Sequence, residues 1–449
     1  MKYARYYETG NESLPQLPET WQMKSGRFCF GENKERNSDL HYRTLLQFTY
    51  GNIVRKKDQT ISKKDSEIFS KYTVVHPMDI MVNGLNLNYD FVSQRIGLVK
   101  ESGAITSAYL SLRCHDIFNP FYANYLLKSL DSKKVFHGMG SGVRLTLGYS
   151  QFSKLQLPVP PRSEQDQIVR YLDWQVSRIN KMIHGYQKQI KLLEEYKWKC
   201  INDAVTHGIH PCEYRTVESN WVSEIPTHWS FDKVKQHFHI KKDIAGKEGY
   251  DVISITQQGL KIKDITKNEG QMAESYAKYQ FVYPGDYAMN HMDLLTGYIG
   301  LSDVFGVTSP DYRVFTLDDT DKCNREYYLY VFQLGYKRKI FYGLGRGAAN
   351  KGRWRMPAEN FKNYDIPVPP KEEQEEIVEY IKEKTRIIDK LIDGVNTQIE
   401  LFREYRTRLI SDVVTGQMDV RGIEIPDYTP EEDIEESDIE EGAVTNDAQ

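Results

Sequence analysis

The pattern of hydrophobic and polar positions is dominated by two long stretches that each carry one apolar stripe. In the first, apolar or semi-apolar residues recur at steps of 4, 4, 3, 4, 3, 4 and 3: Ile168, Leu172, Val176, Ile179, Ile183, Tyr186, Ile190 and Leu193. The second stretch has the same steps: Ile377, Ile381, Thr385, Ile388, Ile392, Val395, Ile399 and Phe402. Alternating steps of three and four predict the seam along which one helix packs against another.

A duplicated motif precedes each stripe and indicates where each helix begins. Residues 157–169 are LPVPPRSEQDQIV, and residues 366–378, at an offset of 209, are IPVPPKEEQEEIV. A double proline suits a helix start, because proline fixes φ and lacks an N–H that would have no partner there. We predict that each helix runs from the residue after the prolines to a shared end at 203–206 and 412–415, with Gly416 as a stop.

Helices of about 45 residues would be roughly 65 Å long. A helix with a single apolar stripe is not stable alone, so we predict that the two helices pair with each other. The alternative, two unrelated surface helices, leaves the matching steps unexplained. Gly185 and Gly394 stand at equivalent mid-helix positions, and we interpret them as points of close helix approach or a kink.

The segments before the two helices are also related. Trp21 is matched by Trp229. The first segment contains short period-two stretches, such as 72–75 and 96–99, and a helix candidate at 121–130. Further matches are HPMD (76–79) with YPGD (283–286), GAITSAY (103–109) with GVTSPDY (306–312), and NPFYANYLL (119–127) with NREYYLYVF (324–332). A repeat of this size predicts one α+β module used twice. Stretches 24–70 and 230–280 share little, so we expect a common scaffold with divergent faces.

This organisation resembles the specificity subunit of type I restriction-modification enzymes. The resemblance rests on the doubled PxPPxxEQxxI motif with its long helix, each behind a variable domain, and it covers residues 15–420. It implies an α+β fold in which two pseudo-repeated target-recognition domains of mixed α/β structure are joined by two long helices forming an antiparallel coiled coil. The expected parts are the target-recognition domains 1–156 and 211–365, the helical spacers 157–210 and 366–420, and an acidic, disordered tail 421–449.

The resemblance also implies a function. The chain would be a non-catalytic subunit that reads a bipartite, asymmetric target on double-stranded DNA, with the helix pair as a ruler between half-sites. Its expected partners are two methyltransferase subunits, which carry S-adenosylmethionine, and restriction/translocase subunits, which use ATP and Mg²⁺. We expect no cofactor or metal in this chain, and we expect the methyltransferases to dock on the outer faces of the helix pair and the repeated helix starts.

The charge distribution supports a DNA-binding body. The net charge of −4 includes ten acidic residues, and no Lys or Arg, in residues 427–449; without them the body carries +6. The acidic tail is either a DNA-mimicking or partner-docking segment, or a solvated extension.

Basic clusters supply the candidate DNA-binding residues, since phosphate contacts come mainly from Lys and Arg. A single cluster is more often a solvated face, so the prediction of DNA binding depends on the clusters taken together. Two glycine-rich segments, 138–145 and 343–356, let the backbone approach phosphate and carry basic residues of their own. Further basic clusters occur at 133–134 and 337–339. The candidates are Arg55, Lys56, Lys57, Lys63, Lys64, Arg144, Lys241, Lys242, Lys261, Lys263, Arg346, Lys351, Arg353 and Arg355.

Two motifs suggest a methyltransferase but stand in the wrong context. FxGxG occurs at 136–140 and 341–345, and Asn119–Tyr122 (NPFY) is one residue from the catalytic NPPY motif. A methyltransferase needs its glycine loop after the first strand of a doubly wound sheet, whereas these glycines follow a helix. In the second half Arg325 replaces the proline. A self-contained DNA adenine methyltransferase and a coiled-coil tether without a DNA role remain the alternatives.

Composition sets the remaining expectations. No run approaches 18 apolar residues, so we expect no membrane span, and the first ten residues contain no apolar signal segment. The five cysteines (29, 114, 200, 212, 323) show no CxxC and no metal-binding spacing. We therefore expect free thiols and a location in a reducing cytoplasm.

Overall fold

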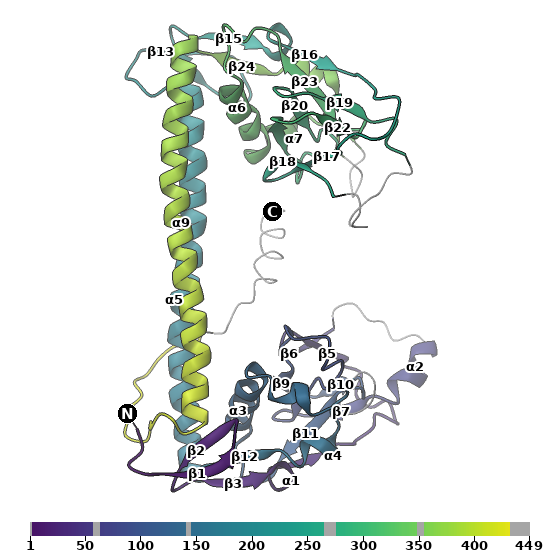
Figure 1. Cartoon of the computed structure of the whole chain (residues 1–449), viewed down its shortest axis with the longest axis vertical. Coiled ribbons are helices and arrows are strands. Elements are labelled where there is room, and N and C mark those ends of the chain that lie inside the picture. The colour runs from purple at the N-terminus through teal and green to yellow at the C-terminus, as the bar shows by residue number, and fades with distance from the viewer. Residues whose placement is uncertain (1, 57–62, 141–144, 265–274, 348–353, 432–449) are drawn as a thin grey trace. The chain divides into compact units, whose positions relative to one another are not determined.

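The computed structural model describes residues 2–56, 63–140, 145–264, 275–347 and 354–431. The chain divides into two compact units: unit 1 comprises residues 1–187 and 396–449, and unit 2 comprises residues 188–395. Each unit contains one α+β domain and one half of each long helix, α5 (Arg162–His207) and α9 (Lys371–Val414) (Figure 1). Both helices begin at the residue after the double proline, as predicted.

The domain of unit 1 is built from short strands and helices in a fixed order. Its helices are α1 (Gly26–Cys29), α2 (Lys63–Phe69), α3 (Pro120–Ser132), the 3-10 helix η1 (Val135–Gly138) and α4 (Tyr149–Phe152). Its strands are β1 (Tyr6–Asn11), β2 (Leu14–Pro18), β3 (Gln22–Ser25), β4 (Phe30–Glu32), β5 (Leu46–Thr49), β6 (Asn52–Arg55), β7 (Thr73–Val75), β8 (Ile80–Val82), β9 (Ile96–Leu98), β10 (Gly103–Ile105), β11 (Leu110–Cys114) and β12 (Gln156–Val159).

The strands of the unit 2 domain follow the same order. Its helices are the 3-10 helix η2 (Val234–Gln236), α6 (Arg325–Lys337), α7 (Ile340–Gly343) and α8 (Ala358–Lys362). Its strands are β13 (Tyr214–Thr216), β14 (Glu224–Pro226), β15 (Ser230–Lys233), β16 (Phe238–Lys241), β17 (Ile253–Thr256), β18 (Gly259–Ile262), β19 (Gln280–Val282), β20 (Tyr287–Met289), β21 (Ile299–Leu301), β22 (Gly306–Thr308), β23 (Arg313–Leu317) and β24 (Asp365–Val368).

The two domains share their sheet topology and register. The antiparallel sheet β4-β11-β8-β9 of unit 1 corresponds to β16-β23-β20-β21 of unit 2. The pairs β1–β2, β3–β12, β5–β6 and β7–β10 correspond to β13–β14, β15–β24, β17–β18 and β19–β22. Leu112 lies opposite Glu32 and Ile80, and its counterpart Phe315 lies opposite Ile240 and Tyr287. The predicted α+β fold, with one module used twice, is confirmed.

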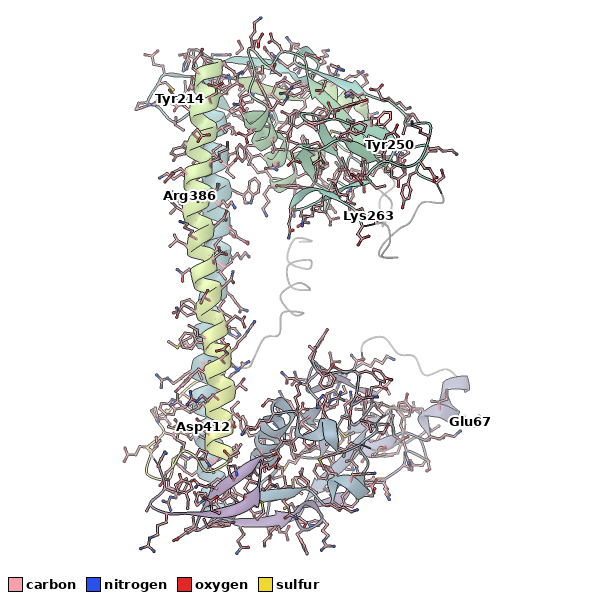
Figure 2. All side chains as sticks on the ribbon, in the orientation of Figure 1. Glu67, Tyr214, Tyr250, Lys263, Arg386 and Asp412 are labelled. Atoms are coloured by element: carbon pink, nitrogen blue, oxygen red, sulfur yellow. The ribbon has the colours of Figure 1, made fainter. Side chains whose placement is uncertain are left out.

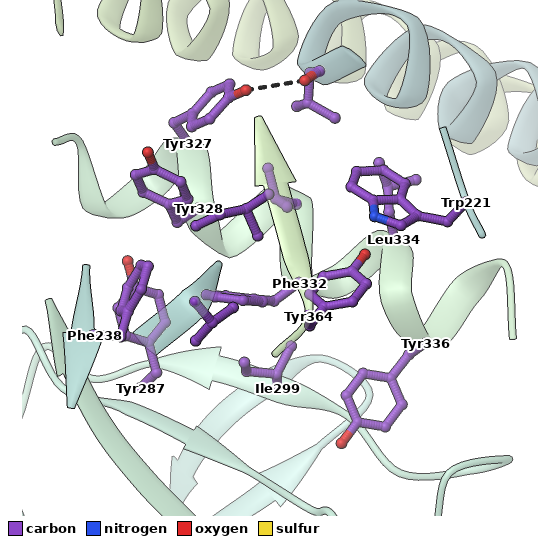
Figure 3. Packing of buried hydrophobic residues seen from close by; sticks show 14 of the residues in the cluster. Trp221, Phe238, Tyr287, Ile299, Tyr327, Tyr328, Phe332, Leu334, Tyr336 and Tyr364 are labelled. Atoms are coloured by element: carbon purple, nitrogen blue, oxygen red, sulfur yellow. Dashed lines mark hydrogen bonds between the residues drawn. The ribbon is translucent and has the colours of Figure 1, made fainter. Parts of the chain in front are cut away.

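An aromatic core holds the sheet of unit 2 against α6. The rings of Tyr287 and Phe315 stack with centroids 5.0 Å apart, and Phe332 of α6 meets Phe315 edge to face at 5.3 Å. Figure 3 shows Tyr287 and Phe332 within this core. Offset and edge-to-face ring pairs stabilise a core beyond the apolar area they bury. In turn α6 lies between this sheet and the long helices (Figure 1). The sheet is therefore anchored to the helix pair through α6.

The long helices pair in antiparallel fashion within each unit. In unit 1 the rings of Tyr186 and Phe402 lie 5.9 Å apart, and in unit 2 Lys197 Nζ lies 2.7 Å from Asp389 Oδ1. The residue numbers of these pairs add to 588 and 586, a nearly constant sum that only antiparallel helices give. Of the predicted seam, Ile168, Leu172, Ile179, Ile183, Ile377, Ile381, Ile388 and Ile399 are buried, and Ile190, Leu193, Ile392 and Phe402 are half-buried.

The two mid-helix glycines have a different environment from the predicted one. A Cβ atom built on Gly185 or on Gly394 would meet no atom within 4 Å, and both residues are exposed. The interpretation as points of close helix approach is therefore wrong. Each glycine stands on the solvent side of an uninterrupted helix, where the backbone freedom of glycine only weakens the helix.

The segment after α9 returns along α5. Gln167 Nε2 donates hydrogen bonds to the carbonyl oxygens of Val420 and Ile423, at 3.1 and 2.8 Å. Further along, the N–H of Glu431 donates to Ser177 Oγ at 2.7 Å, and His184 Nδ1 lies 2.6 Å from Glu431 Oε1. Residues 421–431 are thus bound to α5, whereas the sequence predicted a disordered tail from residue 421. The rest of the tail, 432–449, lies outside the described residues.

Candidate nucleic-acid interface

Each domain is fixed to the end of one long helix by a buried tyrosine. In unit 1 the hydroxyl of Tyr122 on α3 donates to the carbonyl oxygen of Val414, at 2.9 Å. In unit 2 the hydroxyl of Tyr327 on α6 donates to the carbonyl oxygen of Val205, also at 2.9 Å (Figure 3). The last four carbonyls of a helix have no intrahelical donor, so a tyrosine from outside can satisfy one.

The Glu of the duplicated motif binds the same domain at the start of the other helix. Trp21 Nε1 donates to Glu164 Oε1 at 3.0 Å, and Trp229 Nε1 donates to Glu373 Oε2 at 3.0 Å. The Tyr3 hydroxyl also donates to Glu164. A carboxylate in the first turn of a helix is favoured by the positive end of the helix dipole. The tryptophan match noted in the sequence is therefore a docking contact.

The Gln of the motif makes a second contact of this kind. The side-chain oxygen of Gln165 accepts from the backbone N–H of Asn119 at 2.7 Å, and that of Gln374 accepts from Asn324 at 2.7 Å. Their amide nitrogens donate to the carbonyl oxygens of Pro160 and Pro369. The sequence showed the repeated Glu-Gln pair but not this role, since Asn119 and Asn324 lie 46 and 50 residues away from the two glutamines along the chain.

Six of the predicted DNA-binding residues have no described side chain. Lys57, Arg144, Lys351 and Arg353 lie outside the described residues, and only the helical backbone of Lys63 and Lys64, at the start of α2, is described. The side chains that the structure describes are Arg55, Lys56, Lys241, Lys242, Lys261, Lys263, Arg346 and Arg355.

Two of the basic clusters occupy equivalent hairpins. Lys56 follows β6 and its N–H donates to the carbonyl of Leu45 at 2.9 Å; Lys263 follows β18 and its N–H donates to Val252 at 2.7 Å (Figure 2). Arg55 is exposed, with its Nε 2.6 Å from Glu101 Oε2. Lys261 is exposed and donates to Gln258. The β5–β6 and β17–β18 hairpins therefore present cations at the same register in both units.

Lys241 is different, because it neutralises a buried carboxylate. Its Nζ lies 2.7 Å from Asp286 Oδ2 and 4.3 Å from the centre of the Tyr283 ring. The side chain of Lys241 is only 16% exposed, whereas its neighbour Lys242 is exposed. A cation paired in this way is held to the scaffold, and removing it would leave a buried charge unpaired.

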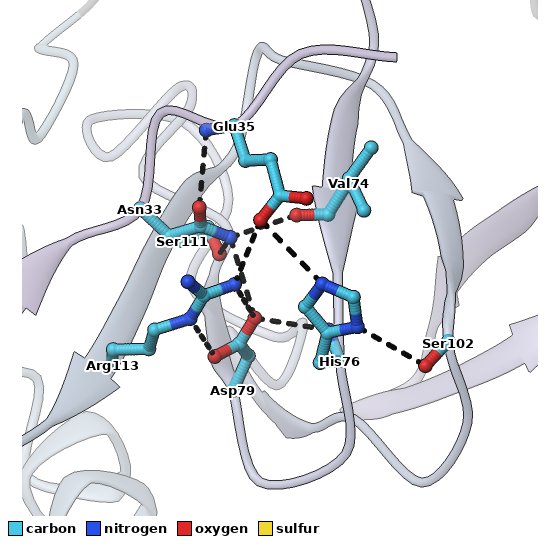
Figure 4. A network of polar contacts seen from close by, with 8 residues as sticks. All are labelled: Asn33, Glu35, Val74, His76, Asp79, Ser102, Ser111 and Arg113. Carbon is cyan, nitrogen blue, oxygen red and sulfur yellow. Dashed lines mark hydrogen bonds and ion pairs between the residues drawn. The ribbon is translucent and has the colours of Figure 1, made fainter. Parts of the chain in front are cut away.

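The equivalent carboxylate of unit 1 takes its cation from another strand. Asp79 Oδ1 accepts from Arg113 Nε on β11 at 3.0 Å, and Asp79 Oδ2 accepts from the N–H of His76 at 3.0 Å (Figure 4). The hydrogen bond to Asp79 raises the pKa of Arg113. Glu35 accepts from the same guanidinium at 3.3 Å. The matched HPMD and YPGD segments thus form the same turn in the two units. The negative charge of its aspartate is compensated by Arg113 of β11 in unit 1 and by Lys241 of β16 in unit 2.

Arg346 and Arg355 form an antiparallel β-bridge in unit 2. Their backbones exchange two hydrogen bonds, at 2.7 and 3.1 Å, and both residues are exposed. Beside them Trp354 stacks on Tyr342 with ring centres 5.4 Å apart. A Cβ on Gly345 would lie 2.3 Å from Trp354 Nε1, so the glycine allows this close packing.

Comparison with known proteins identifies the family. The chain matches the model of the type I restriction modification DNA specificity domain twice, over residues 48–192 and 231–401. The chain belongs to this family. Each match combines most of one target-recognition domain with the start of the long helix that follows it, which is the duplicated unit seen in the structure.

Individual relatives agree with the family assignment. The type I restriction enzyme MjaVIII specificity subunit of Methanocaldococcus jannaschii is 23% identical over 385 residues, covering 81% of this chain and 84% of that protein. The putative type I restriction enzyme MjaX specificity subunit of the same organism is 24% identical over 319 residues, covering 67% and 69%. A chain solved in a study of complex assembly and conformational transition of the type I R-M system has a TM-score of 0.60 at 12% identity, covering 90% and 99%.

In this specificity subunit the methyltransferase-like NPFY motif has a structural explanation. The side-chain oxygen of Asn119 accepts from the N–H groups of Phe121 and Tyr122, and Pro120 stands in the first turn of α3. Asn119 Nδ2 donates to Asp166 at 2.7 Å. Asn and Pro are the residues that helix starts favour. Asn324 caps α6 in the same way, although Arg325 replaces the proline.

The other chemistry-bearing residues have local partners. All five cysteines are free thiols, and burial raises the pKa of Cys29 to about 11 and that of Cys114 to about 12. Among the described residues, no group of three His, Cys, Asp or Glu side chains is placed to hold a metal ion. Within the same part of the chain, no helix has the length and hydropathy needed to cross a membrane.

Proposed function

We propose that this specificity subunit reads a bipartite, asymmetric target on double-stranded DNA, with each unit reading one half-site. The observation that carries the proposal is that the two domains share topology and register but differ in their exposed side chains. The turn between β5 and β6 exposes Tyr50, whereas the turn between β17 and β18 exposes Gln257 and Gln258. Identical contact residues would favour a palindrome.

Phosphate contacts come from the basic hairpins of both units. Lys56 and Lys263 stand at the same register, and Arg346 and Arg355 add exposed cations to unit 2. Such contacts fix the position of a protein on the duplex without reading its sequence. Base recognition therefore has to come from other residues near these hairpins.

The helix pair sets the separation of the half-sites. Each long helix has one end bound to one domain and the other end bound to the second domain, through Tyr122 and Glu164 in unit 1 and Tyr327 and Glu373 in unit 2. A paired helix is stiff, so its length in residues determines the spacer length in base pairs.

Two methyltransferase subunits bind this chain, and restriction/translocase subunits join them. The basis is the duplication, because two equivalent surfaces on the helix pair suit two equal partners. The specificity subunit itself is non-catalytic: the asparagine of NPFY is occupied as a helix cap. S-adenosylmethionine belongs to the methyltransferases, and ATP and Mg²⁺ belong to the restriction/translocase subunits.

The test is to purify the chain with its methyltransferase and to measure mass and DNA affinity. We expect two methyltransferases per chain, and an affinity for target duplex that falls with salt at a log–log slope of about −0.9 per phosphate contact. A 1:1 complex contradicts two-site docking, and a flat salt response favours a tether without a DNA role. Tight binding of S-adenosylmethionine by the chain alone favours a self-contained methyltransferase.

A further inference from the structure

Equivalent loops of the two units expose an aliphatic side chain at the same position. In the β8–β9 loop, Asp90 Oδ1 accepts from the N–H groups of Val92 and Ser93, at 3.1 and 2.9 Å. In the β20–β21 loop, Asp293 Oδ1 accepts from Leu295 and Thr296, both at 3.0 Å. The turn built by each aspartate presents Val92 at 93% exposure and Leu295 at 58%.

A buried arginine is hydrogen-bonded to the β8–β9 loop from inside the domain. Arg95 is fully buried, and its guanidinium donates to the carbonyl oxygens of Asn83, Leu85 and Asp90 at 3.0, 2.8 and 2.6 Å. The backbone N–H of Arg95 donates to the buried Asp131. A loop ordered in advance loses little conformational entropy on binding. The exposure of Val92 is therefore built into the fold.

Val92 belongs to a group of exposed apolar side chains. Tyr89 is 73% exposed and Phe91 is 54% exposed, and Phe91 stacks on His137 with ring centres 4.7 Å apart. Single exposed apolar residues are common, but a contiguous group marks a surface that binds something. The aliphatic Val92 is the most exposed member of the group.

A cation stands directly behind the β8–β9 loop of unit 1. Lys134 donates to the carbonyl oxygen of Phe91, and Lys133 precedes it. In unit 2 the equivalent residues are Arg338 and Lys339. There Arg338 donates to Asn202 Oδ1 and to the carbonyl oxygen of Trp221 instead. Lys134 and Lys339 have the same left-handed backbone, with φ of 60° and 55°. In unit 1 an apolar tip with a cation behind it matches a DNA groove, where base edges lie between two rows of phosphates.

We propose that Val92 and Leu295 read base edges in the major groove through contact with the C5-methyl group of thymine. This inference rests on the proposed function, to which it adds specificity residues. An aliphatic side chain can form no hydrogen bond, and the thymine methyl is the apolar feature that the major groove offers. The loop between strands has 13 residues in unit 1 and 9 in unit 2 (83–95 and 290–298), so the two tips reach different positions in their half-sites.

The experiment compares four variants in the full complex with methyltransferase. Val92→Ala and Leu295→Ala remove most of each exposed side chain. The controls are Ile117→Ala in unit 1 and Ile244→Ala in unit 2, at isoleucines that are 39% and 45% exposed. Methylated sites are then mapped in cells. For Val92→Ala we expect the preference for thymine to be lost at one position of one half-site, and for Leu295→Ala at one position of the other half-site. Both controls should keep the wild-type motif.

A base analogue tests the contact itself. In synthetic target duplexes, thymines are replaced one at a time by deoxyuridine, which lacks the methyl group. Loss of one buried methyl should weaken binding of the wild-type complex about fourfold at the position that Val92 reads. The Val92→Ala complex should show no loss at that position.

The outcomes separate the inference from the proposed function. An unchanged motif in both tip variants, or a wild-type complex insensitive to deoxyuridine throughout its target, overturns the role of the tips. An equal loss of affinity on every sequence overturns it too, since that is the effect of a phosphate contact. A wild-type complex with no sequence preference overturns the proposed function instead.

Discussion

Arg406 of α9 donates a hydrogen bond to the side-chain oxygen of Asn180 in α5, at 2.7 Å. In unit 2 the residues 209 positions away, Asp389 and Lys197, form the corresponding pair, also at 2.7 Å. One pair involves a neutral amide and the other is an ion pair that is partly exposed to water. The duplication thus preserves the geometry of the helix pair while the chemistry of its contacts has changed.

Changing the length of the helix pair should change the spacer of the DNA target. Seven residues inserted within 175–200 and seven within 384–409 add about 10 Å of helix, which is about three base pairs of B-DNA. We expect methylated-site mapping to show the same half-site sequences with a spacer about three base pairs longer. Altered half-sites with an unchanged spacer would contradict a spacer role for the helices.

The docking tyrosines should contribute measurably to stability. Tyr122→Phe and Tyr327→Phe keep the ring but leave the carbonyls of Val414 and Val205 without a donor in a buried site. We expect each to lower the free energy of unfolding by about 1–3 kcal/mol in urea denaturation. The control is Tyr405→Phe, at a residue that is 52% exposed, which should change the free energy of unfolding by less than about 0.5 kcal/mol. Equal effects for all three variants would exclude the docking role.

The mid-helix glycines should be replaceable with a gain in stability. Gly185→Ala and Gly394→Ala add a methyl group that meets no atom within 4 Å, in the middle of an α-helix. Each substitution should raise the free energy of unfolding by about 1 kcal/mol, and the two effects should add. Thermal unfolding of the single and double variants measures this. A loss of stability would show that the glycines serve a purpose that the described contacts do not include.

One half-buried histidine should make unit 2 less stable in acid. Burial, together with the charges of Arg313 and Arg355, lowers the pKa of His291 to about 4. In the unfolded chain histidine has a pKa of about 6.5, so the unfolded chain binds the proton more readily than the folded chain. The stability that His291 contributes is therefore complete above pH 6.5 and is lost as the pH falls towards 4. Over this range the free energy of unfolding falls by at most about 1.4 kcal/mol per pH unit.

The His291→Gln variant isolates that contribution from the titration of the carboxylates. We expect the difference in unfolding free energy between wild type and variant to shrink as pH falls from 7 to 5. A difference that is independent of pH would show that His291 does not titrate in this window.

Periodicity and proline placement predicted the long helices well, because both signals are local. The seam steps gave the buried face, and Pro160–Pro161 and Pro369–Pro370 gave the helix starts to the residue. The matched landmarks of the two halves, such as Trp21 and Trp229, correctly indicated one module used twice.

Contacts between distant residues could not be predicted in this way. The hydrogen bond from Tyr122 to Val414 joins residues 292 apart, and no local pattern reports it. Lys241 looked like its neighbour Lys242 in sequence, yet only the fold shows that Lys241 compensates a buried aspartate. The exposed tip at Val92 was also missed, because an apolar residue in a loop is indistinguishable in sequence from one in a core.

The most direct test of two separate readers is a domain exchange. Residues 15–156 are replaced by the corresponding segment of another type I specificity subunit whose target is known, and methylated sites are then mapped in cells that also produce the methyltransferase. We expect one half-site to change to that of the donor, while the other half-site and the spacer stay as they were. A change in both half-sites, or in neither, would contradict the assignment of one half-site to each unit.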